Sequence, residues 1–337
     1  MVLRIVSDPK AIDRKQWERF VYDHPQGNVF QTPQMYTAYS ATKNYQPIVV
    51  ACYEKDALVG ILLAVVQKEY KGILGKLSAR SIIWGGPLVR DDDISILEEL
   101  MNEYDRTIKK QAIVTQIRNI FSLEWAKDQL QKLGYEYEDH LNILVNLEKS
   151  EEELWKEVHA NRRNKINRAR KNGLQFRLFN DEQSLRQVYS VLKDIYRRTQ
   201  MPLPDLSLFL NLVALPEKES PLRLFIAYNK ENIAGIMLAL CYRERVFEWY
   251  VGGEQRYFNK YPNDMIPWEV FLWGKSHGYK VFDFGGAGKP GIPYGVREFK
   301  LKFGGDLVNL GRFQKTHKPL TMNVAKLGFR LWQLLKK

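Results

Sequence analysis

The chain has 337 residues, enough for two domains of ordinary size, and its 45% hydrophobic and 12% aromatic content is that of a globular protein without a disordered bias. Lys and Arg (51) outnumber Asp and Glu (39), and the net charge of +12 favours a polyanionic partner such as nucleic acid, anionic lipid or a phosphorylated substrate. Two distant cysteines in apolar runs argue against a disulfide framework and predict two buried thiols, which fits a reducing compartment.

The sequence shows no signal for secretion or membrane insertion. The N-terminus lacks the apolar core of a secretory signal, and the longest uncharged apolar run, residues 57–66, is about half the length that spans a bilayer. We therefore expect a soluble cytoplasmic protein. A basic amphipathic helix predicted near residues 324–337 either packs on its own protein or touches the anionic inner membrane surface.

The first half of the chain alternates helical patterns with strand pairs. Helices are predicted at 12–22, 33–43, 94–110 and 124–133, and strands at 47–53, 58–66, 81–84, 112–117 and 141–147. We expect these elements to form a first α/β unit that ends near residue 148.

Two segments of the chain resemble each other. Residues 51–64 and 226–239 are identical at six of fourteen positions at a constant offset of 175, and the matches include a tyrosine, a lysine and a glycine. Each copy reads as strand, polar turn and strand. We infer an internal duplication of one α/β unit, with mixed sheets flanked by helices.

The second half repeats this organisation. Helices are predicted at 151–171, 182–198 and 262–277, and strands at 222–228, around Gly235, at 246–251 and from Val281. The last strand leads into a loop with five glycines and two prolines between Gly285 and Gly295, followed by an amphipathic segment at 299–303. Glycine lets a backbone approach a ligand closely, so this loop is a candidate binding site; a long surface connection is the alternative.

Two cationic features point to an anionic ligand. Residues 162–171 hold six cations in ten positions, which suits a phosphate-bearing partner or simply a solvated basic face. Arg197 and Arg198 end a predicted helix before a proline, where arginine can bind a carboxylate or phosphate with two hydrogen bonds or merely complement the helix dipole.

Several chemistries lack their residues. The five histidines are scattered, so no metal site is predicted. The sequence contains no Walker lysine loop, no strand-linked GxGxxG that opens a helix and no GxSxG. Nucleotide hydrolysis, hydride transfer and serine hydrolysis therefore lose most of their support.

The segments RRNKINRARKNG, YRRTQMP, FEWYVGG and FDFGGAG followed by REFKLKFGG resemble, in this order, the FemABX family of aminoacyl transferases, which build amino-acid branches on the stem peptide of peptidoglycan precursors. With HPQGNVFQTPQMY and WGGPL, the similarity extends over nearly the whole chain. The resemblance implies two tandem GCN5-related acetyltransferase-like (GNAT-like) domains. The first is residues 1–148 completed by a C-terminal helix at 317–337, and the second, with the main site, is 149–316.

The resemblance also implies the partners and the reaction. An amino acid would move from aminoacyl-tRNA to an amine of a lipid-linked or nucleotide-linked muropeptide, with no cofactor. The developing oxyanion needs positive charge nearby, and Lys300 is the candidate to stabilise it or the tRNA end. Phe299 would stack on a base or shape the site, and Arg198, with Arg197 as the second candidate, would bind a phosphate or carboxylate of the precursor.

Further residues complete the candidate site. Tyr250 and Tyr294 would hydrogen-bond the substrate, and Asp283 is either a base or a structural cap of the loop amides. The backbone would approach the substrate at the first two glycines of the loop, and cationic side chains would contact tRNA or phosphate. The two glycines are Gly285 and Gly286. The cations are Arg162, Arg163, Arg168 and Lys302.

Two other functions compete with this one. The first is an acyl-CoA-dependent N-acyltransferase acting on an amino sugar or a polysaccharide precursor, although the Gln/Arg-x-x-Gly-x-Gly/Ala turn that holds a pyrophosphate is missing. The second is a non-catalytic module that binds nucleic acid or anionic lipid. The chain also departs from the glycine-bridge-building family members, because no heptads sustain their inserted coiled coil.

Overall fold

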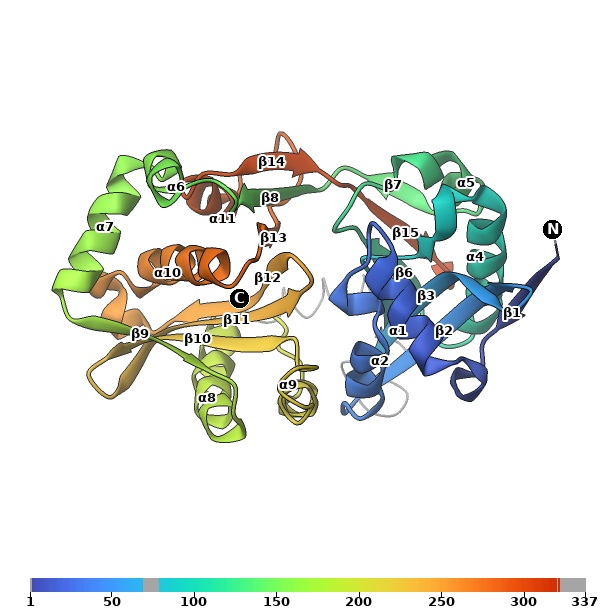
Figure 1. Cartoon of the computed structure of the whole chain (residues 1–337), viewed down its shortest axis with the longest axis horizontal. Coiled ribbons are helices and arrows are strands. Elements are labelled where there is room, and N and C mark those ends of the chain that lie inside the picture. The colour runs from blue at the N-terminus through green and yellow to red at the C-terminus, as the bar shows by residue number, and fades with distance from the viewer. Residues whose placement is uncertain (1, 69–78, 320, 322–337) are drawn as a thin grey trace. The chain divides into compact units, whose positions relative to one another are not determined.

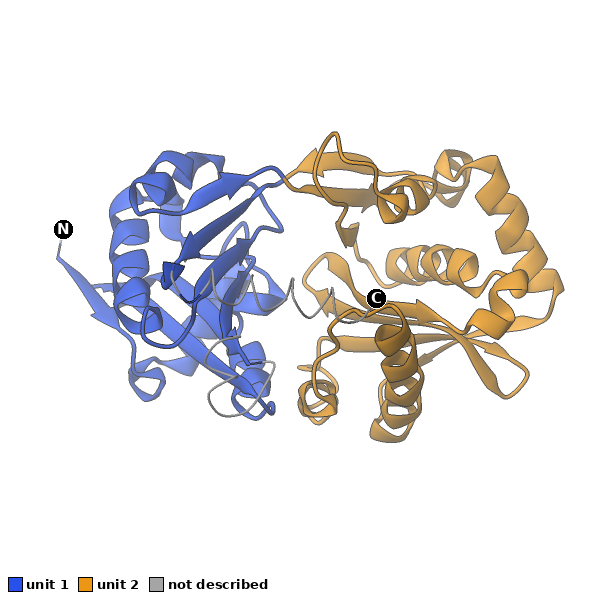
Figure 2. Ribbon diagram, turned by 180° about the vertical axis from the view of Figure 1, so that it is seen from behind, with its two compact units in different colours: residues 1–139, 310–337 blue, residues 140–309 orange. Residues whose placement is uncertain are grey.

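The computed structural model describes residues 2–68, 79–319 and 321. The chain folds into two compact units (Figure 2). The first comprises Met1–Asp139 and Leu310–Lys337, and the second comprises His140–Asn309. Each unit is a mixed β-sheet flanked by helices (Figure 1), which confirms the predicted fold class.

The sheet of the first unit has the strand order β1-β2-β3-β4-β6-β15-β7, with β5 paired to β3. Its elements in chain order are β1 (Leu3–Val6), η1 (Pro9–Ala11), α1 (Arg14–Asp23), η2 (Val29–Gln31), α2 (Pro33–Ser40), β2 (Tyr45–Glu54), β3 (Ala57–Gln67), β4 (Arg80–Trp84), β5 (Leu88–Val89), η3 (Arg90–Asp92), α4 (Ile94–Ile108), β6 (Val114–Arg118), η4 (Glu124–Ala126), α5 (Lys127–Lys132), β7 (Glu136–Glu138) and β15 (Arg312–Thr316).

The sheet of the second unit has the order β14-β8-β13-β12-β11-β10-β9. Helix α10 lies on one face of β9–β12, and α8 and α9 lie on the other (Figure 1). The elements are β8 (Leu141–Asn146), α6 (Glu151–Glu157), α7 (Ala160–Lys171), β9 (Leu174–Phe179), α8 (Glu182–Arg198), α9 (Leu206–Val213), β10 (Leu222–Asn229), β11 (Asn232–Tyr242), β12 (Arg245–Gly253), η5 (Gln255–Lys260), α10 (Pro262–Ser276), β13 (Val281–Gly286), α11 (Gly295–Leu301) and β14 (Asp306–Asn309).

The hairpins β2–β3 and β10–β11 are structural copies of each other. Cys52 pairs with Gly60, and 175 residues later Ala227 pairs with Gly235. The register shifts directly after Cys52 in one hairpin and directly after Ala227 in the other. The repeat seen in the sequence is therefore a repeat of structure.

The shared lysine and glycine have equivalent roles in the two copies. Lys55 and Lys230 form the turns with φ of 54° and 55°. A methyl group on Gly60 would meet Ile96 of α4 at 2.7 Å, and one on Gly235 would meet Pro262 of α10 at 2.8 Å. Both glycines are needed because a helix crosses closely over each hairpin.

The boundary between the units differs from the predicted one because the units exchange a strand. Strand β8, expected to complete the first unit, pairs with β13 and β14 in the second sheet. Strand β15, expected in the second unit, pairs with β6 and β7 in the first. The chain thus divides after residues 139 and 309 rather than after 148 and 316. The C-terminal helix predicted at 317–337 lies almost wholly outside the described residues.

Helix boundaries follow the caps that the sequence supplies. Asp93 accepts a hydrogen bond from the Ser95 amide at 2.7 Å and starts α4, and Ser150 with Glu153 forms a capping box on α6. The helix predicted over 151–171 is in fact two helices, because the chain turns at Val158 and His159 in extended conformations.

The core of the second unit lies between its sheet and α10, and includes Trp268, Phe271, Phe282 and Phe303. Both cysteines are free and buried, as predicted. No helix within the described residues is long and apolar enough to cross a membrane.

Candidate active site

The parallel strands β12 and β13 diverge and form a fork. They pair only from Arg245 with Val281 to Phe247 with Asp283. Beyond this point β12 continues along β11 to Gly253, and β13 continues along β8 to Gly286. Diverging strands leave the backbone groups of their inner edges without a strand partner, so a ligand or a side chain can bind there.

Lys300 of α11 fills the base of the fork. Its Nζ lies 2.9 Å from Oε1 of Glu248, the first residue of β12 beyond the paired region. It also donates a hydrogen bond to the carbonyl of Phe284, the first residue of β13 beyond the region paired with β12. The Lys300 and Glu248 side chains are 11% and 7% exposed, so the ion pair is nearly buried.

Asp283 anchors the turn at the end of β13. Its fully buried carboxylate is 3.0 Å from Nη1 of Arg245 and accepts a hydrogen bond of 2.7 Å from the Gly285 amide. Gly285 has a φ of +67°, which glycine adopts without strain. These contacts match the structural role considered for Asp283, and they place Gly285 and Gly286 beside the fork.

Burial raises the pKa of the two carboxyls at the fork, those of Glu248 and Asp283. Burial raises the pKa of the Glu248 carboxyl, and the positive charge of Lys300 partly opposes this shift. Burial likewise raises the pKa of Asp283, against the lowering effect of Arg245. The fork therefore combines a fixed ammonium group with two carboxyls that hold their protons more tightly than usual.

The corresponding strands of the first unit, β4 and β6, pair in parallel over a longer stretch, from Arg80 with Val114 to Trp84 with Arg118. After Trp84 the chain continues along β3 as β5, which among the described residues does not pair with β6. The buried side chain of Gln31 donates to the Trp84 carbonyl at 2.7 Å. A glutamine side chain in the first unit, and Lys300 in the second, thus bonds to a backbone carbonyl near the end of the parallel pairing.

Aromatic side chains extend the site along β12. The rings of Tyr250 and Tyr196 are 5.9 Å apart. Burial, with a smaller contribution from Glu248, raises the pKa of Tyr196 to about 12. Arg198, two residues further along α8, donates to Gln255 at 3.0 Å, just past the end of β12. The contacts of Lys300 and Arg198 thus fall on either side of Tyr250 along the chain, at Glu248 within β12 and at Gln255 just after it.

Arg197 has a different position. Its side chain is 79% exposed and forms an ion pair with Asp194 at 3.0 Å, one turn back on α8. This geometry suits a solvated helix end better than a shared ligand site.

The glycine-rich loop is fastened by an arginine that the sequence reasoning passed over. Nη1 of Arg297 donates to the carbonyls of Lys289 at 2.7 Å and Ala287 at 3.3 Å, and Nη2 donates to that of Ile292. The Tyr294 ring lies against Gly288, where an added methyl group would be 3.0 Å from the ring. Tyr294 is thus part of the folded loop, with 41% of its surface exposed.

Two predicted contacts of the basic helix are already used within the protein. Arg162 is buried in an ion pair with Asp264, and its guanidinium carbon lies 4.1 Å from the centre of the Phe299 ring. Phe299 also packs on Phe303 at 5.3 Å. Arg162 and Phe299 therefore stabilise the base of α11 rather than offer free surfaces to a ligand.

Of the other predicted cations, Arg163 bonds within the protein, and Arg168 and Lys302 are exposed. Arg163 donates to the carbonyls of Trp155, Lys156 and Val158 and so caps the end of α6. Arg168 is exposed and lies 5.0 Å from the Tyr261 ring, and Lys302 is exposed after α11. Of the four predicted cations, Arg168 and Lys302 are therefore the two that are exposed for contact with a large anionic partner.

Glu248 is the main site residue that sequence reasoning missed. In the sequence it stands only within the segment FEWYVGG, which carries part of the family resemblance. The available signal was an acidic side chain inside a segment that otherwise reads as buried strand, which requires a cationic partner. Among the described residues no cluster of three metal-ligating side chains exists.

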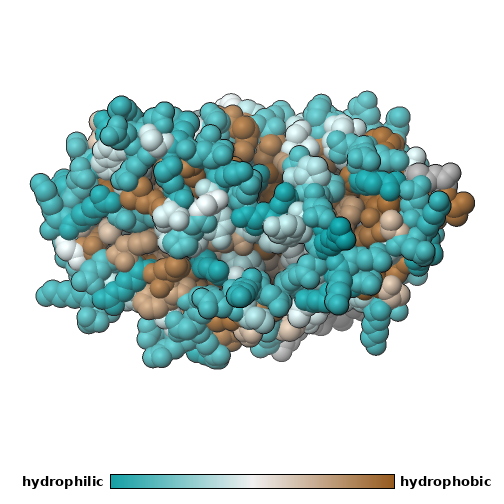
Figure 3. Space-filling view, viewed as in Figure 1, coloured by the Kyte–Doolittle hydropathy of each residue, from teal (hydrophilic) through white to brown (hydrophobic). Residues whose placement is uncertain are grey.

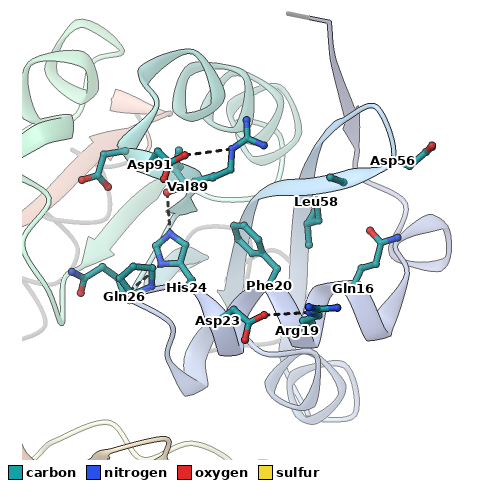
Figure 4. Close-up of a pocket in the computed structure, with 14 residues that line it drawn as sticks. Gln16, Arg19, Phe20, Asp23, His24, Gln26, Asp56, Leu58, Val89 and Asp91 are labelled. Carbon is teal, nitrogen blue, oxygen red and sulfur yellow. Dashed lines mark hydrogen bonds and ion pairs between the residues drawn. The ribbon is translucent and has the colours of Figure 1, made fainter.

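The first unit has a cavity of about 770 Å³ that none of the predicted site residues lines (Figure 4). Its charged groups are largely paired with one another, as in Arg19 with Asp23 at 3.3 Å. His24 donates from Nε2 to the Val89 carbonyl at 2.9 Å, because its Nδ1 accepts from the Gln26 amide. We assign no function to this cavity.

Residues 156–300 match the family model of the acetyltransferase (GNAT) domain, a range that ends at Lys300. No match was found among curated protein sequences. The structure of FemX superposes with a TM-score of 0.72 at 15% identity, over 96% of this chain and 100% of that chain. This chain has the tandem GNAT fold.

Two further structures share the tandem GNAT fold. L-PGS from Bacillus licheniformis has a TM-score of 0.59 at 17% identity, over 94% of this chain and 96% of that chain. A tandem GNAT protein from the clavulanic acid biosynthesis pathway has a TM-score of 0.61 at 9% identity, over 94% of this chain and 99% of that chain. The predicted FemABX-like fold is confirmed, and the matched family model is that of an acyltransferase domain.

Proposed function

We propose that the chain is an aminoacyltransferase that moves an amino acid from aminoacyl-tRNA to an amine of a peptidoglycan precursor stem peptide. The observation that carries this proposal is the position of Lys300, whose ammonium group lies at the base of a strand fork. The likeness to FemX in fold and the motifs quoted above support the choice of acyl donor and acceptor.

In the proposed reaction the acceptor amine attacks the ester carbonyl of the donor. A C–N bond forms and the ester C–O bond breaks. The proton lost by the amine passes to the tRNA oxygen, which leaves as a hydroxyl. The carbonyl oxygen becomes negative in the transition state and needs a fixed positive group nearby. Two N–H groups of Lys300 are directed to Glu248 and Phe284, and within the described residues the third can reach a ligand oxygen.

Glu248 acts as a positioning residue in this scheme. Its side chain lies 2.9 Å from the Lys300 Nζ and fixes the direction of the ammonium group. The diverging strands offer backbone groups to an extended, amide-bearing chain such as a stem peptide. Arg198 would bind a phosphate or carboxylate of the acceptor, and Arg168 and Lys302 would contact tRNA.

The second candidate is acyl transfer from acyl-CoA to an amino sugar or another envelope precursor. The match of residues 156–300 to an acetyltransferase domain favours it. An extended acyl-CoA arm could also pair with the inner edges of the fork. Against it stands the missing glycine-rich pyrophosphate turn before α10.

One experiment separates these functions. Purified protein receives labelled aminoacyl-tRNA or labelled acyl-CoA, each with a muropeptide acceptor, and transfer to the acceptor is measured. Label passing from aminoacyl-tRNA supports the proposal, and label passing only from acyl-CoA rejects it in favour of the second candidate. Salt-dependent tRNA binding without transfer from either donor would indicate a non-catalytic module.

A further inference from the structure

Exposed apolar side chains concentrate in the glycine-rich loop and the first turn of α11, which follows it. Ile292, Tyr294 and Val296 are 58%, 41% and 43% exposed, three within five residues. In the rest of the described chain, each exposed large hydrophobic residue lies at least five residues from the next. The surface seen in Figure 3 is mostly hydrophilic, with hydrophobic residues in small patches. A run of exposed apolar side chains on such a surface marks an interaction site.

The loop is built to hold these side chains outward. The Arg297 guanidinium binds three loop carbonyls, those of Ala287, Lys289 and Ile292, so the backbone needs no partner from a neighbouring element at these positions. Charge-assisted hydrogen bonds of this kind fix the loop conformation. The apolar side chains therefore stay exposed although the loop itself is ordered.

Charge indicates what the loop meets. Residues 286–309 contain four cations and two acids, a net charge of +2 within a chain of net charge +12. Lys289 and Lys302, on either side of the apolar run, are exposed. An apolar tip flanked by cations complements an anionic lipid surface, where side chains enter the headgroup region and lysines attract the lipid charge.

We propose that segment 287–296, the glycine-rich loop with the start of α11, docks on an anionic lipid bilayer, with Ile292, Tyr294 and Val296 in the interfacial layer. The loop begins where β13 ends, two residues after the Phe284 carbonyl that binds Lys300. Docking would therefore bring the fork to the height of the headgroups. The benefit for catalysis rests on the proposed function, since it requires a lipid-linked acceptor, but docking itself does not.

The test is co-sedimentation of the full chain with vesicles of phosphatidylglycerol and phosphatidylcholine in equal parts, or of phosphatidylcholine alone. The wild-type protein should bind the anionic vesicles preferentially. The Ile292→Ser/Val296→Ser variant should lose about tenfold in partition coefficient. The control Leu178→Ser/Met201→Ser, which also replaces two exposed apolar residues of the second unit, should stay within about twofold.

Three results would overturn the proposal. The wild-type protein fails to bind anionic vesicles, or the Ile292→Ser/Val296→Ser variant binds as tightly as wild type. In the third, size-exclusion chromatography shows a wild-type dimer that this variant abolishes, which would assign the loop to a second copy of the chain. The donor assay described above is independent, so a protein that transfers no amino acid can still confirm docking.

Discussion

Lys300 is at once the candidate catalytic group and one half of a nearly buried ion pair. Its replacement by alanine alone therefore leaves the Glu248 carboxylate buried without a partner. The structure predicts for Lys300→Ala a loss of about 3–5 kcal/mol in the free energy of unfolding.

The double variant Lys300→Ala/Glu248→Gln separates the two roles. It carries no unpaired charge, so urea denaturation should show that it recovers a large part of the lost stability, while transfer activity stays at the level of Lys300→Ala. Lys302→Ala, two residues away and exposed, serves as the control for the stability measurement. Lys300→Ala with wild-type stability would show that the pair contributes nothing to folding.

The raised pKa of Glu248 gives a signed dependence of stability on pH. In the unfolded chain this carboxyl loses its proton near its usual pKa of 4.5, whereas the folded protein holds the proton to higher pH. The folded state thus binds more protons between the two pKa values, and stability falls as the pH rises through this window.

The Glu248→Gln variant lacks this contribution. We expect the free energy of unfolding of wild type minus that of the variant to decrease as the pH rises from about 4.5 towards neutrality. Urea denaturation of both proteins at a series of pH values measures this difference. A difference that is constant or grows with pH would contradict the assignment.

At the level of single residues, the sequence indicates candidate groups but not the side chains with which they pair. Lys300 was found because a cation follows a glycine-rich loop, and that signal is local. Its partner Glu248 is 52 positions away in sequence, and nothing local links the two. The same applies to Arg162, which reads as part of a basic face until Asp264, on another helix, neutralises it.

The basic helix α7 contains buried, ion-paired cations such as Arg162 and exposed cations such as Arg168. Arg162→Ala breaks a buried ion pair and removes the stacking on Phe299, so thermal unfolding should show a stability loss of about 3–5 kcal/mol. Arg168→Ala should leave the melting temperature nearly unchanged, because the side chain is exposed.

Affinity for tRNA should depend on Arg168 more than on Arg162, which is the reverse of their effects on stability. Arg168→Ala should weaken binding and reduce the slope of log affinity against log salt by about 1, as expected for one lost phosphate contact. Filter binding at several salt concentrations measures this slope. If Arg168→Ala leaves the slope unchanged, the polyanion does not meet α7 at this residue.

Among the elements, those with long periodic patterns and caps were predictable. Helices α4, α8 and α10 and the two hairpins match the expected ranges to within a few residues. Short edge strands such as β7 and β14, of three and four residues, carry too little pattern to be recognised. The break between α6 and α7 was missed because the Arg163 hydrogen bonds that end α6 follow from the folded geometry.

For the whole molecule, the exchange of β8 and β15 sets which fragments can fold. A fragment of residues 1–148 lacks β15, the strand between β6 and β7, and carries β8 without its partners β13 and β14. Both defects expose unpaired strand edges. We expect this fragment to aggregate or to unfold without cooperativity in circular dichroism.

A fragment of residues 140–309 is the matched control. It contains every strand of the second sheet and should show a cooperative thermal transition. Cooperative unfolding of fragment 1–148 would show that β15 is dispensable for the first sheet. The duplication was visible in the sequence, but the exchange was not, because strand pairing between distant segments leaves no local pattern.

The strand order also has a consequence for biosynthesis. A ribosome makes β6 and β7 early, yet their shared neighbour β15 emerges only after residues 140–309 have been added. At about 5–20 residues per second, the nascent N-terminal half waits roughly 10–35 s with an open gap in its sheet. The N-terminal half of the polypeptide is therefore the last to mature, and it is the part of the newborn chain that most needs a chaperone.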